Sequence, residues 1–89
     1  MTSKNKICCN GIAYRQGFIE VQSDVHEGFV NIETWMIDSN VKITNTKNIS
    51  ALDINDTDFI GNTELELTID QANELIVALQ VAVAKIHQR

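Results

Sequence analysis

Residues 64–87 read ELELTIDQANELIVALQVAVAKIH, a short strand followed directly by one long helix. The alternation in Glu64–Leu67 predicts a strand with its leucines inside and its glutamates outside. Thr68 is typical of a helix N-cap, and Gln71, three residues later, completes a capping box. We therefore expect a helix from about Ile69 to about His87.

One face of this helix carries apolar residues at spacings of three and four, which is the pattern of a helix that lies on a sheet. We expect this stripe to form the core with the sheet. Its members are Ala72, Leu75, Ile76, Leu79, Ala82, Val83 and Ile86.

A second apolar group, formed by Val77, Val81 and Ala84, lies almost opposite that stripe, where charged or polar residues are usual. One interpretation is an interface, either of a homodimer in which two helices pair or of a groove for another partner. The other is that these are ordinary surface residues, since scattered exposed apolar side chains are common.

Two alternating runs, Phe18–Val25 and Phe29–Ile37, predict an antiparallel hairpin. A strand within Lys6–Arg15 precedes it, and Val41–Asn45 predicts a further strand. Residues 46–62 lose the pattern and predict a long loop, with a short helical turn or an edge strand. We expect a single α+β domain over residues 1–89, with an antiparallel sheet of about four to five strands and one long C-terminal helix packed on one face. The sheet order stays open.

The composition, 44% hydrophobic and 21% charged, is that of a folded chain. Its formal net charge of -5 would repel a phosphate backbone, so direct nucleic-acid binding is not expected. A basic protein surface, including one that normally holds nucleic acid, is the better electrostatic match. The alternative is that the acidity serves only solubility.

The first residues lack the apolar run of a signal peptide, and no apolar stretch approaches the ~20 residues of a membrane span, so a cytoplasmic protein is expected. Cys8 and Cys9 are adjacent, which predicts reduced cysteines on a strand. A metal site made with His26 and His87 is not expected, because neighbouring strand residues point to opposite faces. No cofactor is predicted.

Catalytic patterns are weak in this chain. Ser23, Asp24 and His26 lie close together, but nothing around them resembles a nucleophile elbow. Glu20 and Glu33 could face each other as an acid and base pair, yet one sheet with one helix offers no cleft to shift their pKa values. We expect no catalytic residue and no enzymatic activity.

The outward face of the hairpin combines Phe18, Phe29 and Trp35 with Glu20 and Glu33. Aromatic anchors surrounded by charge are typical of a protein interface, and here the charge fits a basic partner. The alternative is that the sheet curls, or the long loop folds across, and covers the aromatic side chains.

Within the predicted loop, Asp53, Asp56 and Asp58 belong to a segment with the oxygen spacing of an EF-hand. Asp58 stands where the calcium loop needs glycine, so calcium binding is not expected. The segment is either a solvated acidic loop or a patch that imitates nucleic-acid phosphates toward a basic protein.

The segment Leu67–Leu79 resembles the strand-then-helix ending of many small phage and plasmid proteins. In size, acidity and lack of catalytic residues, the chain also looks like phage anti-defence proteins, of which anti-CRISPR proteins are the best known. This resemblance implies an inhibitor that acts in a bacterial host cell on a basic surface of a CRISPR-Cas type or nucleic-acid-handling complex. A homodimeric structural or assembly module and a toxin-immunity protein are the alternatives.

Overall fold

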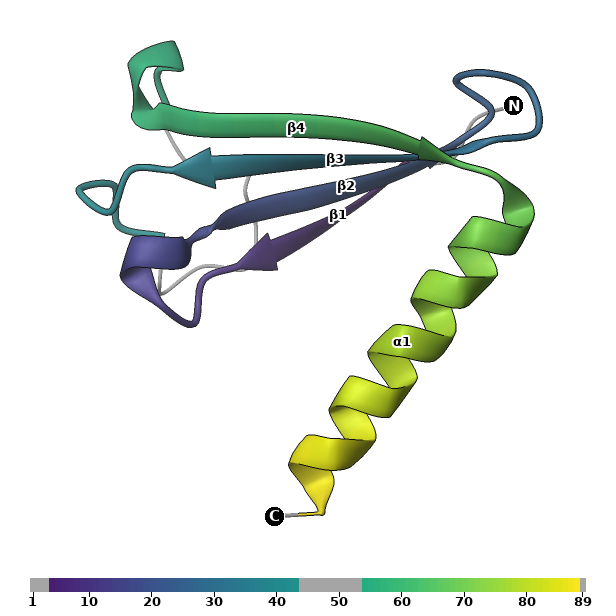
Figure 1. The fold of residues 1–89 in the computed structure, drawn as a ribbon. Helices are drawn as coiled ribbons and strands as arrows, with labels where there is room; N and C mark the ends of the chain where they lie inside the picture. The colour runs from purple at the N-terminus through teal and green to yellow at the C-terminus, as the bar shows by residue number, and fades with distance from the viewer. Residues whose placement is uncertain (1–3, 44–53, 89) are drawn as a thin grey trace.

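The computed structural model of the chain describes residues 4–43 and 54–88. The strands form one antiparallel sheet in the order β1-β2-β3-β4, and the helix follows the last strand (Figure 1). The α+β class, the antiparallel sheet and the C-terminal helix are thereby confirmed. The elements are β1 (Lys4–Cys9), β2 (Gly17–Ser23), β3 (Val30–Ile37), β4 (Phe59–Leu67) and α1 (Ile69–His87).

The predicted hairpin is the centre of the sheet. Phe18 on β2 lies opposite Trp35 on β3. The turn that joins the two strands contains Asp24 with φ 59° and Gly28 with φ 85°. This left-handed region favours glycine and tolerates aspartate, and the Gly28 N–H donates to Asp24 Oδ1 at 2.9 Å. The turn residues therefore fix the register of the pair.

Alternation along the strands gives the sheet two different faces. We call the apolar face the one that carries Ile7, Ile19, Val21, Val30, Ile32, Met36, Leu65 and Leu67, and the acidic face the one that carries Phe18, Glu20, Glu33, Trp35, Glu64 and Glu66. The buried core among the described residues is small. It consists of Phe18, Ile37 and Ile43, with Trp35 and Phe59 packed against it.

The chain after β3 differs from the expected strand at Val41–Asn45. Asp38 begins a turn, as the Val41 N–H donates to its carbonyl oxygen at 3.0 Å, and residues 41–43 form no strand. The side-chain amide of Gln16 donates to the carbonyl oxygens of Asp38, at 2.9 Å, and Val41, at 2.6 Å. These bonds hold the segment near the start of β2, so it cannot continue as a ladder. Residues 44 and 45 lie outside the described residues.

The last strand is longer than its leucine and glutamate alternation predicts. β4 begins at Phe59 rather than at Glu64, and a 3-10 turn, Asp56–Asp58, precedes it. A register shift between Met36 and Ile37 of β3 interrupts the regular alternation there. The expected long loop over residues 46–62 therefore ends before Asp56 in its described part, which forms a helical turn and then the first residues of β4.

The helix and its N-terminal cap agree with the sequence. α1 begins at Ile69, and Thr68 Oγ1 accepts a hydrogen bond from the Gln71 N–H at 3.2 Å. The Gln71 side chain accepts one from the Thr68 N–H at 3.0 Å, which completes the capping box. These bonds satisfy donors that the first helical turn would otherwise leave open.

Replacing Thr68 with alanine should destabilise the first turn of α1 by about 1 kcal/mol, because the Gln71 N–H loses its acceptor. Amide hydrogen exchange of Gln71 to Leu75 should become faster, with a small loss of helical circular dichroism. Thr57→Ala, at an exposed residue outside the helix, is the control and should change neither signal. Equal exchange rates in both variants would show that the cap does not hold the helix end.

The expected packing of the helix on its own sheet is not confirmed. α1 leaves the end of β4 and diverges from the sheet (Figure 1). Leu79 of the stripe is 57% exposed, and Leu65, expected inside, is 70% exposed. The physical reason is the connection: Thr68 alone joins β4 to α1, whereas a chain that turns back onto its sheet commonly uses a loop of about 2–6 residues.

Candidate functional site

A row of glutamates crosses the acidic face. Glu20 on β2 lies opposite Glu33 on β3, and Glu33 lies opposite Glu64 on β4. Lys6 on β1 lies opposite Glu20 at the other end of the row. Like charges directly opposite each other across paired strands destabilise a sheet. The row is therefore an arrangement that does not serve the stability of the fold.

Side-chain amides hold two of these carboxylates in place. The Asn62 amide donates to Glu33 Oε2 at 3.1 Å and to the carbonyl oxygen of Thr34 at 2.9 Å. The Asn31 amide donates to Glu64 Oε2 at 3.2 Å. Each donor lies on a strand next to its acceptor, so the sheet itself orients the charges.

A third carboxylate extends the acidic face toward the β2–β3 turn. Glu66 lies opposite Asn31, and His26 Nδ1 lies 2.6 Å from Glu66 Oε1. The imidazole ring of His26 therefore lies against the carboxylate of Glu66 on β4.

The carboxylates of the acidic face differ in how accessible they are to a partner. Glu20 is only 7% exposed, Glu33 is half-buried, and Glu64 and Glu66 are exposed. Glu20 therefore offers little surface to a partner, contrary to its expected place on an open face. Glu64 and Glu66 are candidates that the sequence did not single out: alternation places them on the outer face, but only the strand register brings Glu64 opposite Glu33 and Glu66 opposite Asn31.

The aromatic residues form a cluster rather than an open surface. The ring centroids of Phe18 and Trp35 lie 6.1 Å apart, and those of Trp35 and Phe59 lie 5.1 Å apart. Phe18 is buried and Trp35 is half-buried, so the expectation that Phe18 is exposed is wrong. Ile43 and Ile54, from the chain between β3 and β4, pack against the rings and exclude water.

Hydrogen bonds fix the segment that covers this cluster. The Asn10 amide donates to the carbonyl oxygen of Ile43 at 3.0 Å. The Asp38 N–H donates to the carbonyl oxygen of Asp58 at 2.8 Å. The alternative interpretation of the sequence, a cover over the aromatic face, is therefore the one that the structure shows for Phe18.

Phe29 does not join the other aromatic residues. It lies in the β2–β3 turn, where its carbonyl oxygen accepts from the Asp24 N–H at 3.1 Å, and its side chain is 42% exposed. Phe18 and Trp35 pair near the opposite end of the hairpin. A single aromatic anchor surface made of all three residues is thus not formed.

The acidic loop is partly described. Asp56 is exposed in its 3-10 turn, while an oxygen of the Asp58 carboxylate accepts from the Asn55 N–H at 2.9 Å. Asp58 therefore stabilises the turn itself, and Asp56 is the carboxylate of the turn that faces solvent. Asp53, the remaining predicted residue, lies outside the described residues.

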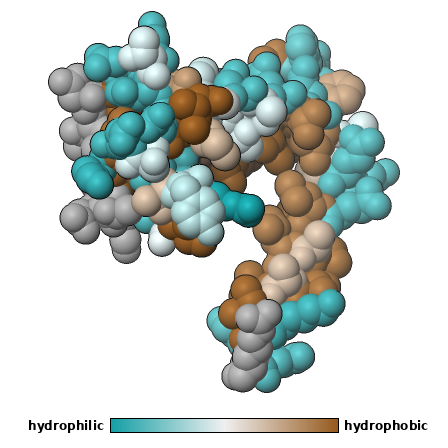
Figure 2. All heavy atoms as spheres, turned by 60° about the vertical axis from the view of Figure 1, so that its left-hand side comes forward, coloured by the Kyte–Doolittle hydropathy of each residue, from teal (hydrophilic) through white to brown (hydrophobic). Residues whose placement is uncertain are grey.

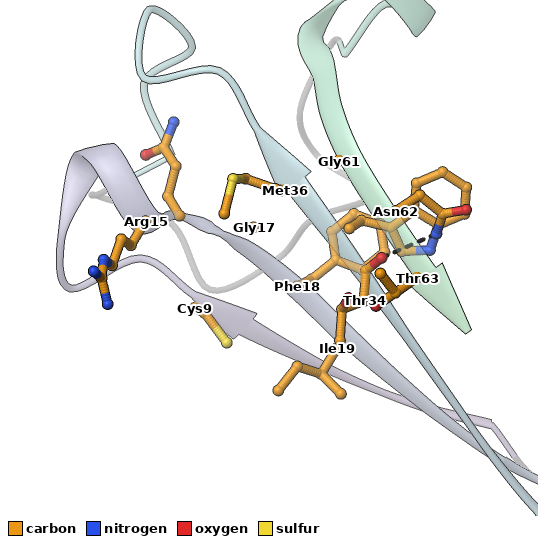
Figure 3. A pocket seen from close by; sticks show the side chains of 12 residues that line it. Cys9, Arg15, Gly17, Phe18, Ile19, Thr34, Met36, Gly61, Asn62 and Thr63 are labelled. Atoms are coloured by element: carbon orange, nitrogen blue, oxygen red, sulfur yellow. Dashed lines mark hydrogen bonds between the residues drawn. The ribbon is translucent and has the colours of Figure 1, made fainter. Parts of the chain in front are cut away.

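A shallow hollow of about 240 Å³ lies on the apolar face (Figure 3). Its floor is a row of paired residues that crosses all four strands: Cys9, Gly17, Met36 and Gly61. Gly17 and Gly61 carry no side chain, so no side chain projects from the floor on either side of Met36. The hollow can accept an apolar side chain from outside the chain. No sequence pattern indicates it, because the row forms only by strand pairing.

The two cysteines lie on opposite faces of β1, as expected for strand residues, and neither forms a disulfide with the described residues. Cys8 packs against the core and Cys9 lines the hollow. Burial raises the pKa of the Cys8 thiol, and the neighbouring Cys9 raises it further. Cys8 is therefore a poor nucleophile near neutral pH.

The residues predicted for a helix dimer, Val77, Val81 and Ala84, are all exposed on α1. Val77 is 56% and Val81 49% exposed. The structure thus keeps them available, and their pairing with another helix stays a prediction.

Within residues 4–43 and 54–88, no group of three or more His, Cys, Asp or Glu side chains is arranged to hold a metal ion. Over the same residues, no helix has the length and apolar character needed to cross a membrane. Comparison with protein-family models, curated proteins and solved structures finds no match. The acidic row and the uncovered apolar surfaces are the features on which a function can be argued.

Proposed function

We propose that this protein acts by binding, without catalysis, to a basic surface of a larger bacterial protein or nucleoprotein complex, and that it inhibits that partner. The observation that supports the proposal is the row of carboxylates in register on β2, β3 and β4, since it costs the sheet stability. A basic partner would remove that cost by placing opposite charges against the row.

The geometry of the row suits recognition of a surface that holds nucleic acid. Neighbouring strands lie about 4.8 Å apart, so Glu33 and Glu64 present two closely spaced negative charges to a surface that normally holds phosphates. Their amide partners orient the carboxylates before binding, which lowers the entropy lost on association. The net charge of -5 would speed the encounter.

The test begins with capture of partners by the full chain from a nuclease-treated bacterial lysate at low and moderate salt. We expect one basic partner, retained less at the higher salt. With this partner purified, Glu64→Lys should weaken binding about tenfold or more, because it reverses a charge within the row. Glu27→Lys makes the same charge change at an exposed turn residue and is the matched control.

Three outcomes would contradict the proposal: no specific basic partner, binding that salt does not weaken, or equal binding by the Glu64→Lys and wild-type proteins. Equal losses in the Glu64 and Glu27 variants would show that net charge alone, and not the row, drives the association.

A further inference from the structure

The apolar face of the sheet has no cover among the described residues. Val21, Ile32 and Leu65 pair in one row across β2, β3 and β4. Leu65 is 70% exposed, and Ile7 on β1 is 53% exposed. A sheet face of this kind is normally buried against a second layer.

The helix α1 lacks a second layer as well. Leu79 and Ile86 of its main stripe are 57% and 59% exposed, and Val77 and Val81 are exposed on the other side. In the space-filling view, apolar side chains run from the sheet onto the helix and stay open to solvent (Figure 2). A helix that is apolar on more than one side is typical of a buried helix.

The chain exposes more surface and is more extended than a compact monomer of the same size. Its accessible surface is 6872 Å², whereas a compact monomer of 10.0 kDa has roughly 5,200 Å². Its radius of gyration is 14.7 Å, against about 12 Å for a compact chain of this length. The surplus is about 1,700 Å² per chain, or about 3,300 Å² over two chains, and an obligate homodimer interface buries roughly 2,000–5,000 Å² over two chains.

We propose that a second copy of the chain supplies the missing cover, with α1 of each copy lying on the apolar face of the other. The two surfaces match in length: the 19 residues of α1 span about 28 Å, and the nine residues of β4 span about 30 Å. The hollow around Met36 receives an apolar side chain of the incoming helix. The helix of each copy thus covers the apolar sheet face of the other.

A two-fold axis also accounts for the second side of the helix. With α1 helices antiparallel about Leu79, Val77 of one copy meets the partner's Val81. The same arrangement places Glu74 of one copy near Lys85 of its partner, which pairs opposite charges at both ends of the contact. The helix therefore uses one stripe for the partner's sheet and the other for the partner's helix.

The short connection at Thr68 explains why the two copies exchange their helices, that is, why α1 of each copy packs on the sheet of the other. A single residue between β4 and α1 keeps the helix from reversing onto its own sheet, but leaves it free to reach a neighbour. The inference does not rest on the proposed binding of a basic surface. The acidic face lies on the other side of the sheet and stays outside the dimer.

The first experiment measures the mass of the full chain by light scattering and sedimentation. We expect twice the chain mass of 10.0 kDa and a melting temperature that rises with protein concentration. In a mixed sample of isotope-labelled and unlabelled copies, isotope-filtered spectra should show contacts between Leu79 methyl groups of one copy and Leu65 methyl groups of the other. These contacts distinguish exchange from pairing of the helices alone.

Leu65→Glu is the informative variant, because the side chain is exposed in one chain and buried in the dimer. It should raise the dimer dissociation constant about a hundredfold or more. Glu27→Gln, at an exposed residue of the β2–β3 turn, should leave that constant unchanged. If Leu65→Glu has the mass of a monomer but still captures the partner, the dimer and the binding proposed for the acidic face are independent of each other.

A monomeric wild-type mass at high concentration would overturn the proposal, as would contacts between α1 and the sheet within one chain. A dimer with helix-to-helix contacts but none between helix and sheet would overturn the exchange. If Leu65→Glu prevents folding altogether, the mass and the isotope-filtered spectra of the wild-type protein still show whether the helix-exchanged dimer exists.

Discussion

Gly17→Ala is expected to unfold most of the protein. A Cβ atom at this position would overlap the carbonyl oxygen of Trp35 and lie 2.9 Å from its carbonyl carbon. Both atoms belong to the backbone of β3, so no side-chain rotation relieves the clash, and the β2–β3 pairing must open. We expect a loss of about 3 kcal/mol or more in the free energy of unfolding. A core this small rarely supplies more than about 3–5 kcal/mol.

Urea denaturation followed by circular dichroism measures the loss. Gly11→Ala is the matched control, because nothing lies within 4 Å of the position of its added Cβ atom. It should leave the midpoint of unfolding nearly unchanged. If the two variants unfold at the same urea concentration, the close approach of β2 to β3 at Gly17 does not exist.

Ile37→Ala should be the next most damaging change. Ile37 is 1% exposed and packs with Phe18 and Ile43, so the shorter side chain leaves a cavity in the centre of a small core. We expect a loss of about 2–4 kcal/mol in the free energy of unfolding. Trp35 packs against the same cluster, so its fluorescence should report the loosening directly.

The control for this prediction is Ile60→Ala. Ile60 is a neighbouring isoleucine on β4 with 57% exposure, and its truncation should change the free energy of unfolding by about 0.5 kcal/mol or less. Similar losses at Ile37 and Ile60 would argue against a core centred on Ile37. They would instead indicate that Ile60 becomes buried in an assembled form.

The acidic face and the apolar face are two sides of one sheet, and the alternation of the strands produces both. If α1 of a second copy covers the apolar side, the carboxylates of both copies point outward. The proposed dimer therefore carries two acidic surfaces, each available to a basic partner. Binding and self-association then use separate residues, with Glu33 and Glu64 for the first and Leu65 and Leu79 for the second.

Features that depend on near neighbours in the chain were predictable from the sequence. The capping box of Thr68 and Gln71 lies within one helical turn, and the start of α1 at Ile69 follows from it. The β2–β3 hairpin and the division of its residues between two faces follow from alternation with period two. Local sterics and hydrogen bonding decide these features, so the sequence by itself determined them.

The candidate site depended on pairing between distant segments. Glu33 and Glu64 become neighbours only through the register of β3 and β4. Phe18 is buried because Ile43 and Ile54 fold over it, and no periodicity in β2 contains that information. The sequence placed these residues on a face, whereas the tertiary structure decided which of them stay open to a partner.

The helix shows the same division. Its apolar stripe established that some surface must cover α1, since burying apolar area drives folding and association alike. The stripe could not establish whether the chain's own sheet or another molecule provides that surface. The single residue between β4 and α1, together with the direction in which the strand ends, decided that the helix leaves its own sheet, because a chain can pack against itself only where its connections let it turn back.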